Sequence, residues 1–170
     1  SLLERGAEPG GMLGLISRSY PDDRDPTEKI AAFRERMIST PRIAFYPRSK
    51  IISARGYAGN FTLRFSSADE ERKVTAGAVI LATGGRIFLP KGFYRYGEVK
   101  EVISQMEMET RFKKGPVTAK SALFIQCVGA RCEERPYCST ICCPASIKNA
   151  MRIMESDPSA QAWVLHRDIM

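Results

Sequence analysis

Five cysteines are the residues of this chain whose types and spacing could do chemistry. Cys127 is followed by a loop that holds Cys132, and then come Cys138, Cys142 and Cys143. A thiolate is both a nucleophile and a soft metal ligand. The cluster of cysteines therefore indicates either a metal centre or a redox-active thiol site.

Several interpretations of these cysteines stand side by side. Stable disulfides are disfavoured, because the sequence shows no secretory signal and five is an odd number. A zinc site, an iron–sulfur cluster, redox-active thiols and inert buried cysteines remain. Adjacent Cys142 and Cys143 fit awkwardly around one small tetrahedral ion, whereas a larger cubane cluster offers corners that lie farther apart. The pattern favours a cluster without excluding the other three.

The elements around the cysteines must bring them together. The sequence predicts a buried strand over 122–127, a loop over 128–138, a helix over 139–156 and a second strand over 161–167. Cys138 and Cys142 would then face the same way at the start of the helix, and Cys127 would arrive from the strand. A helix N-terminus favours anionic sulfur. Two strands joined by a helical crossover are parallel and right-handed, as in half of a dinucleotide-binding α/β domain.

Upstream, the pattern predicts a mixed α/β arrangement. An amphipathic helix is expected over 27–39 and another over 103–112. Strands are expected at 43–46, 50–57 and 61–65, with a hairpin turn at 58–60 and a polar loop over 66–72. The run from Val74 to Thr83 becomes continuously apolar, which is typical of a strand buried on both faces of a sheet. We expect three parts: 1–100, a connecting helix and linker over 101–120, and 121–170.

Composition limits the function classes. The formal charge is +7 and the sequence pI is about 9.3, but Lys and Arg are scattered rather than gathered in a stripe. Aromatic residues are not interleaved with them, so a nucleic-acid partner is not expected. No apolar run reaches the length of a membrane span, and direct membrane insertion is not expected. The protein is expected in the cytoplasm.

The cysteine segment resembles the signature of a known family. The stretch Phe124-Ile125-Gln126-Cys127-Val128-Gly129-Ala130-Arg131, followed by Pro136-Tyr137-Cys138-Ser139-Thr140-Ile141-Cys142-Cys143, closely resembles that of the heterodisulfide reductase A-like family. Flavoprotein subunits of quinone-interacting membrane-bound oxidoreductases share this signature. Gly77 to Gly84 resembles the strand that the family places against its flavin, and Leu165 to Ile169 resembles the strand after its cysteine helix. The resemblance therefore covers nearly the whole chain.

The resemblance implies a fold, two cofactors and their residues. The fold would be part of an FAD/NAD(P)-binding, Rossmann-like and thioredoxin-reductase-like α/β structure, with a β-hairpin or small antiparallel sheet. The cofactors would be FAD and a [4Fe–4S] cluster in an electron-transfer oxidoreductase. Cluster ligands would be Cys127, Cys138, Cys142 and Cys143. Glu4 would hold the adenosine ribose hydroxyls. The backbone would approach the flavin cofactor closely at five residues: Gly10, Gly11, Thr83, Gly84 and Gly85.

The chain also departs from the family pattern. The first strand and its Gly-x-Gly-x-x-Gly turn do not occur before Ser1, so FAD is expected in a larger parent protein, and this piece is expected to be inactive alone. Cys132 stands where the family often has Asp or another polar residue, and two roles for it stay open, an alternative ligand and a free thiol. Other subunits of an electron-transfer complex are the expected partners, and a homodimer stays open. The rival functions are a zinc-stabilised interaction module and a dithiol–disulfide oxidoreductase that uses Cys142 or Cys143. No catalytic acid or base is expected.

Overall fold

The computed structural model describes residues 1–169, and contacts between residues group them into two units. One unit consists of Ser1–Gly14 and Thr27–Gly85. The other consists of Leu15–Pro26 and the described residues from Arg86 onward. The three-part division expected from the sequence rests on a different criterion and stays a prediction.

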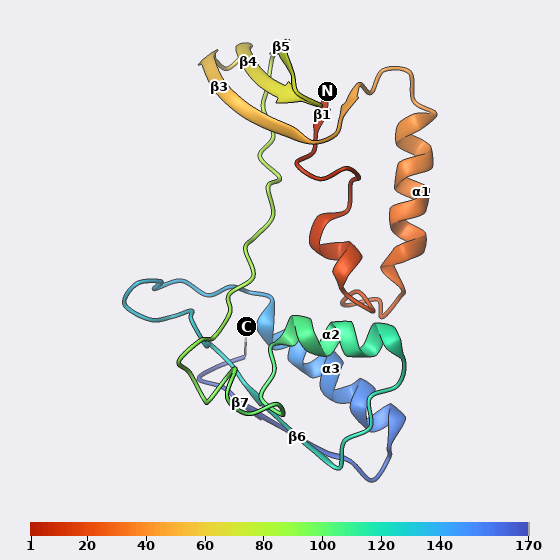
Figure 1. Ribbon diagram of the computed structural model, residues 1–170, viewed down its shortest axis with the longest axis vertical. Helices are drawn as coiled ribbons and strands as arrows, with labels where there is room; N and C mark the ends of the chain where they lie inside the picture. The colour runs from red at the N-terminus through yellow and green to blue at the C-terminus, as the bar shows by residue number, and fades with distance from the viewer. Residues whose placement is uncertain (170) are drawn as a thin grey trace. The chain divides into compact units, whose positions relative to one another are not determined.

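The first unit contains a small antiparallel sheet of three strands, β3 (Ser49–Tyr57), β4 (Asn60–Ser67) and β5 (Glu70–Ala76) (Figure 1). Phe61, Leu63 and Phe65 alternate along β4, and Leu63 and Phe65 are buried, as the period of two predicts. Tyr57 pairs with Asn60, which confirms the predicted hairpin turn. Tyr46 packs edge-on against Phe65 with ring centroids 5.0 Å apart.

The first unit also holds a short parallel pair and all but the first residue of one helix. Strand β1 (Leu2–Leu3) pairs in parallel with β2 (Phe45–Tyr46). A short 3-10 helix follows at Gly11–Leu15. Helix α1 (Pro26–Ile38) confirms the predicted helix and begins at a proline, whose fixed φ suits the first helical position.

Two expectations for this unit were wrong. Strand β5 occupies 70–76 and so begins inside the polar loop expected over 66–72, because Ala68 and Asp69 both take positive φ and form a tight two-residue turn back onto β4. The apolar run that was expected to be a buried strand up to Thr83 leaves the sheet after Ala76. Ile80 is 90% exposed and Leu81 is 78% exposed. A strand needs a neighbour for its backbone hydrogen bonds, and beyond Gly77, whose carbonyl accepts from the Gly59 N–H, the described residues provide no paired strand for this run.

The second unit is a strand–helix–strand crossover with an added helix. Strands β6 (Ser121–Ile125) and β7 (Gln161–Leu165) pair in parallel, and α3 (Cys142–Ser156) connects them. Helix α2 (Gln105–Lys114) lies beside α3 (Figure 1). One core joins these elements through side chains from both helices, from β6 and from the turn before β7: Phe112, Phe124, Ala150, Ile153 and Ala160. The predicted parallel crossover is confirmed.

The α/β class predicted from the sequence is confirmed by this mixture of a three-stranded antiparallel sheet and small parallel pairs. Among the described residues, no helix has the length and apolar character that a bilayer crossing requires.

Candidate metal centre

Cys127 lies two residues beyond the end of β6, in a strained backbone conformation. Its φ is +62°, a left-handed value that a residue with a side chain rarely adopts. The residue before it is still held by the sheet, because the Gln126 N–H donates to the Leu165 carbonyl over 2.9 Å. The chain therefore turns away from the sheet at Cys127 itself.

Arg131 places positive charge near Cys127. Its pKa is raised, first by a hydrogen bond to Asp168 and the charge of that carboxylate, and to a smaller extent by the charge of Cys127 and a hydrogen bond to it. Arg167 in turn donates to the Arg131 carbonyl over 2.9 Å. Arg131 belongs to the cysteine signature, but the sequence pattern assigns it no role, since it does not show that Asp168 holds its side chain.

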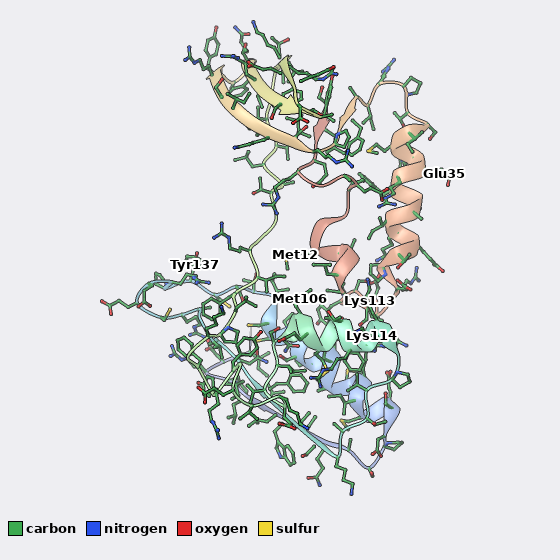
Figure 2. All side chains as sticks on the ribbon, viewed as in Figure 1. Met12, Glu35, Met106, Lys113, Lys114 and Tyr137 are labelled. Atoms are coloured by element: carbon green, nitrogen blue, oxygen red, sulfur yellow. The ribbon has the colours of Figure 1, made fainter. Side chains whose placement is uncertain are left out.

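The loop between Cys127 and Cys138 is closed by its own hydrogen bonds. The backbone groups of Cys132 and Arg135 bond to each other in both directions over 3.1 Å, and the Arg131 N–H donates to the Tyr137 carbonyl. Cys132 is exposed at this turn. The pKa of Glu134 is lowered by a hydrogen bond from its own backbone and, next, by one from Cys132. Tyr137 is exposed on the same loop (Figure 2).

Cys138 and Cys142 each receive a hydrogen bond from a neighbouring residue. The Thr140 N–H lies 3.3 Å from the Cys138 sulfur, and the Ser139 hydroxyl lies 3.4 Å from the Cys142 sulfur. Hydrogen bonds to sulfur stabilise its thiolate form and influence the properties of a metal bound to it. The local backbone is therefore already shaped around sulfur acceptors.

Helix α3 begins at Cys142, which corrects the expected start at 139. Thr140 has a φ of +59°, and this left-handed residue separates Cys138 from the helix. The expectation that Cys138 and Cys142 share one helical face is therefore wrong, because a helical spacing argument applies only inside the helix. Cys142 and Cys143 occupy the first two helical positions.

The start of α3 is electrostatically suited to thiolates. Its N-cap residue is Ile141, whose side chain cannot accept a hydrogen bond from the first turn, and no side chain caps the helix. Pro144 carries no N–H at all. The N–H groups of the first turn and the positive end of the helix dipole therefore lie next to Cys142 and the buried Cys143.

The donor set fits soft metal chemistry, although the thiols do not surround one point. All five cysteines are free. Within residues 1–169, no three side chains of His, Cys, Asp or Glu lie together as an ion-binding group. The chemistry of the candidates, four thiols with nearby N–H donors and a nearby guanidinium, fits an anionic iron–sulfur cluster. The ligand set stays a prediction.

The residues expected at the flavin lie in the first unit. Glu4 follows β1, and its Oε1 accepts a hydrogen bond from the Gly6 N–H over 2.6 Å. Gly10 has a φ of +124°, and an added Cβ there would lie 3.3 Å from the Ile30 side chain, so this glycine already serves packing against α1. Gly11, Gly84 and Gly85 are different. A Cβ at these three positions would meet nothing within 4 Å.

The open space at these glycines would let a ligand approach the backbone closely. The Glu4 carboxylate is an acceptor of the kind that binds ribose hydroxyls, which would donate to it. Thr83 lies in the exposed segment after β5. The assignment of these positions to a flavin cofactor stays a prediction.

Comparison with known proteins identifies relatives but no matching family model. The chain is 32% identical over 123 residues to the A subunit of a H2/formate:CoB-CoM heterodisulfide,ferredoxin reductase from Methanococcus maripaludis, which is 63% of this chain and 19% of the relative. It is 33% identical over 127 residues to the iron-sulfur A subunit of a CoB–CoM heterodisulfide reductase from Methanocaldococcus jannaschii, covering 65% of this chain and 19% of that protein.

A third relative is also the A subunit of a heterodisulfide reductase. The A subunit of the H2:CoB-CoM heterodisulfide,ferredoxin reductase of Methanothermobacter thermautotrophicus is 34% identical over 116 residues, which is 59% of this chain and 18% of the relative. The chain thus spans about a fifth of the length of the curated relatives it matches. The resemblance predicted from the cysteine signature is confirmed over 59% to 65% of the chain, rather than nearly all of it: this part is similar to A subunits of heterodisulfide reductases.

Proposed function

We propose that this chain is part of an electron-transfer oxidoreductase of the heterodisulfide reductase A type, and that Cys127, Cys138, Cys142 and Cys143 hold a [4Fe–4S] cluster. The observation that carries the proposal is the position of these cysteines, one just after a strand and two at the uncapped start of the crossover helix. The printed name of one relative, which calls it iron-sulfur, supports it.

The surrounding residues would hold an anionic group in place. The Thr140 N–H and Ser139 hydroxyl would continue to donate to the sulfurs of Cys138 and Cys142. Arg131, held by Asp168, would offset negative charge near Cys127. The burial of Cys143 would limit access of water to its sulfur. When bound, the cluster would supply one-electron transfer, and the protein's part is to set its potential and protect it.

The proposal also includes the binding of FAD by the complete protein. Glu4 would accept hydrogen bonds from ribose hydroxyls, and the open backbone at Gly11, Gly84 and Gly85 would admit the cofactor. Gly10 and Thr83 would line the same region.

The proposed partners are other subunits of an electron-transfer complex, since the relatives are named as subunits. Those names give no support to the homodimer that the sequence left open. We place the protein in the cytoplasm, because thiolate ligands persist in a reducing compartment.

Anaerobic reconstitution with iron and sulfide tests the proposal. The expected product is brown, contains about four irons per chain, and gives a cubane EPR signal after reduction with dithionite. Cys138→Ala should lose the cluster. Cys132→Ala is the matched control, since it removes a thiol from the same loop and should retain the cluster.

Other outcomes favour the rival functions. A colourless protein that binds one zinc through thiolates would replace the electron-transfer site with a structural module. Metal-free thiols that react rapidly and cycle with a disulfide substrate would indicate a dithiol oxidoreductase. Equal iron loss in Cys138→Ala and Cys132→Ala would contradict the assignment of the four ligands.

A further inference from the structure

A layer of buried polar side chains lies along α3 behind the cysteines. Cys143, Ser146 and Asn149 follow one face of the helix and are 4%, 0% and 0% exposed. Asn149 donates to the Gln105 side-chain oxygen over 2.8 Å, and the Gln105 amide donates to the Ser146 hydroxyl. Polar groups are costly in such a place unless they are paired.

Gln126 belongs to this buried region and has an unused donor. The residue is 8% exposed, and its side-chain Nε2 has no hydrogen-bond partner among the described residues. A buried amide donor without a partner lowers the stability of the fold. Gln126 directly precedes Cys127, and its backbone N–H is still paired with β7.

Strand and helix geometry indicate which way Gln126 faces. Phe124, two residues earlier on the same face of the chain, packs in the core with Ala150 and Ile153 of α3. Two strand residues advance about 6.6 Å, which corresponds to about four residues of helix. Since α3 runs back against the strands, Gln126 lies level with the turn that holds Ser146, one turn from Cys143.

We infer that Gln126 is a positioning residue of the cluster, whose side-chain N–H group donates to a sulfur of the metal centre. This inference rests on the proposed function above. Gln126 directly precedes Cys127 in the chain, and its unpartnered buried donor is of the kind that an anionic sulfur accepts. A hydrogen bond to sulfur stabilises the more negative, reduced cluster and raises its reduction potential.

The test uses the reconstituted 170-residue chain and two readouts that do not depend on activity. Gln126→Met removes the amide and keeps the length of the side chain. It should retain about four irons per chain and lower the reduction potential, so that the ratio of reduced to oxidised cluster falls several-fold at a fixed applied potential. An exchangeable-proton coupling in the electron–nuclear double resonance spectrum should also disappear.

Gln105→Met is the matched control. It makes the same change in the same polar layer, but the Gln105 amide already donates to Ser146. It should lower stability and leave the potential unchanged. Gln126→Glu is a second variant, which replaces the donor with an acceptor and should lower the potential further.

The outcomes separate the two proposals. A wild-type chain that takes up no cluster overturns the proposed function. A wild-type chain that takes up the cluster, with potential and proton coupling unchanged in both Gln126 variants, overturns the role of Gln126 alone.

Discussion

The ring of Phe88 lies directly against the backbone of Gly129, so closely that a Cβ on this glycine would be 2.3 Å from the ring. The guanidinium of Arg135 lies over the same ring, 4.9 Å from the ring centroid, and Phe93 packs edge-on against it. The segment after Cys127 therefore packs against an aromatic loop about forty residues earlier in the chain. This contact positions the loop that leads to Cys138.

Gly129→Ala should destabilise the second unit through this contact. Gly129 has a φ of +70°, and Gly92 in the same unit has a φ of +81° with no atom within 4 Å of an added Cβ. Gly92→Ala therefore measures the backbone cost alone, about 1–2 kcal/mol. Gly129→Ala should cost about 1–3 kcal/mol more, because the Phe88 ring must move. Urea unfolding of both variants checks this, and equal losses would contradict the close contact.

Lys148→Met should be strongly destabilising. Lys148 and Glu109 form a buried ion pair at 2.5 Å, and Ser17 also donates to Glu109. Removal of the lysine leaves a buried carboxylate without its cation, which costs about 3–5 kcal/mol. Arg64→Met breaks the exposed pair with Glu71 and should cost less than about 1 kcal/mol. Comparable losses in thermal unfolding would show that burial of the first pair does not matter.

The pair should also make stability depend on pH at the acid end. Burial raises the pKa of Glu109, but hydrogen bonds and charge from Lys148 and hydrogen bonds from Ser17 outweigh this, so the folded pKa lies below 4.5. A lowered carboxyl pKa contributes stability above the unfolded value, and this contribution is lost as pH falls through the folded pKa. Acid titration of Glu109→Gln should show a smaller loss of stability below about pH 4.5 than the wild type. An identical acid transition would contradict this assignment.

Ser104→Ala should weaken the start of α2. The Ser104 hydroxyl accepts from the Glu107 N–H, and the Glu107 carboxylate accepts from the Ser104 N–H over 2.7 Å, which is a complete capping box. Its loss should cost about 1 kcal/mol. Ser66→Ala, an exchange of the same type within β4, has no helix to uncap and serves as the control. Amide hydrogen exchange at the first turn of α2 should accelerate in the first variant only.

Thr140 offers a sharp test of the cysteine loop. Thr140→Gly keeps the N–H that donates to Cys138 and accepts the φ of +59° without strain, so cluster loading should be unchanged. Thr140→Pro removes the N–H and forbids this φ, so loading should fall severalfold or more. Iron content after anaerobic reconstitution is the measurement. Equal loading in both variants would mean that this backbone donor is irrelevant to the site.

The sequence predicted the elements whose partners lie close in the chain. The alternation of Phe61, Leu63 and Phe65 located β4, and the Ala58–Gly59 turn located its hairpin partner. The crossover from β6 through α3 to β7 also followed, because two apolar strands around an amphipathic helix leave few other arrangements. The expectation that β6 is buried was wrong, since Leu123 is 55% exposed. In each case the pattern itself contains the packing that stabilises the element.

The failures involve information that no periodicity contains. The charged segment Glu70–Ala76 is a strand because it pairs with β4 at the edge of a sheet, where charged side chains remain exposed. The apolar run after it forms no strand of any sheet among the described residues. The start of α3 depends on the positive φ of a single residue, Thr140. The unpartnered side-chain N–H of Gln126 could not be predicted either, because its burial depends on packing between segments that are distant in the chain.

The reciprocal hydrogen bonds between Cys132 and Arg135 have a practical consequence for engineering. They close the loop below its tip, so extra residues placed between Glu133 and Glu134 would extend outward without pulling on Cys127 or Cys138. Lengthening an exposed loop costs only about 0.6 kcal/mol for each doubling. The tip is therefore a suitable place for a reporter peptide that follows electron transfer from just outside the proposed metal centre.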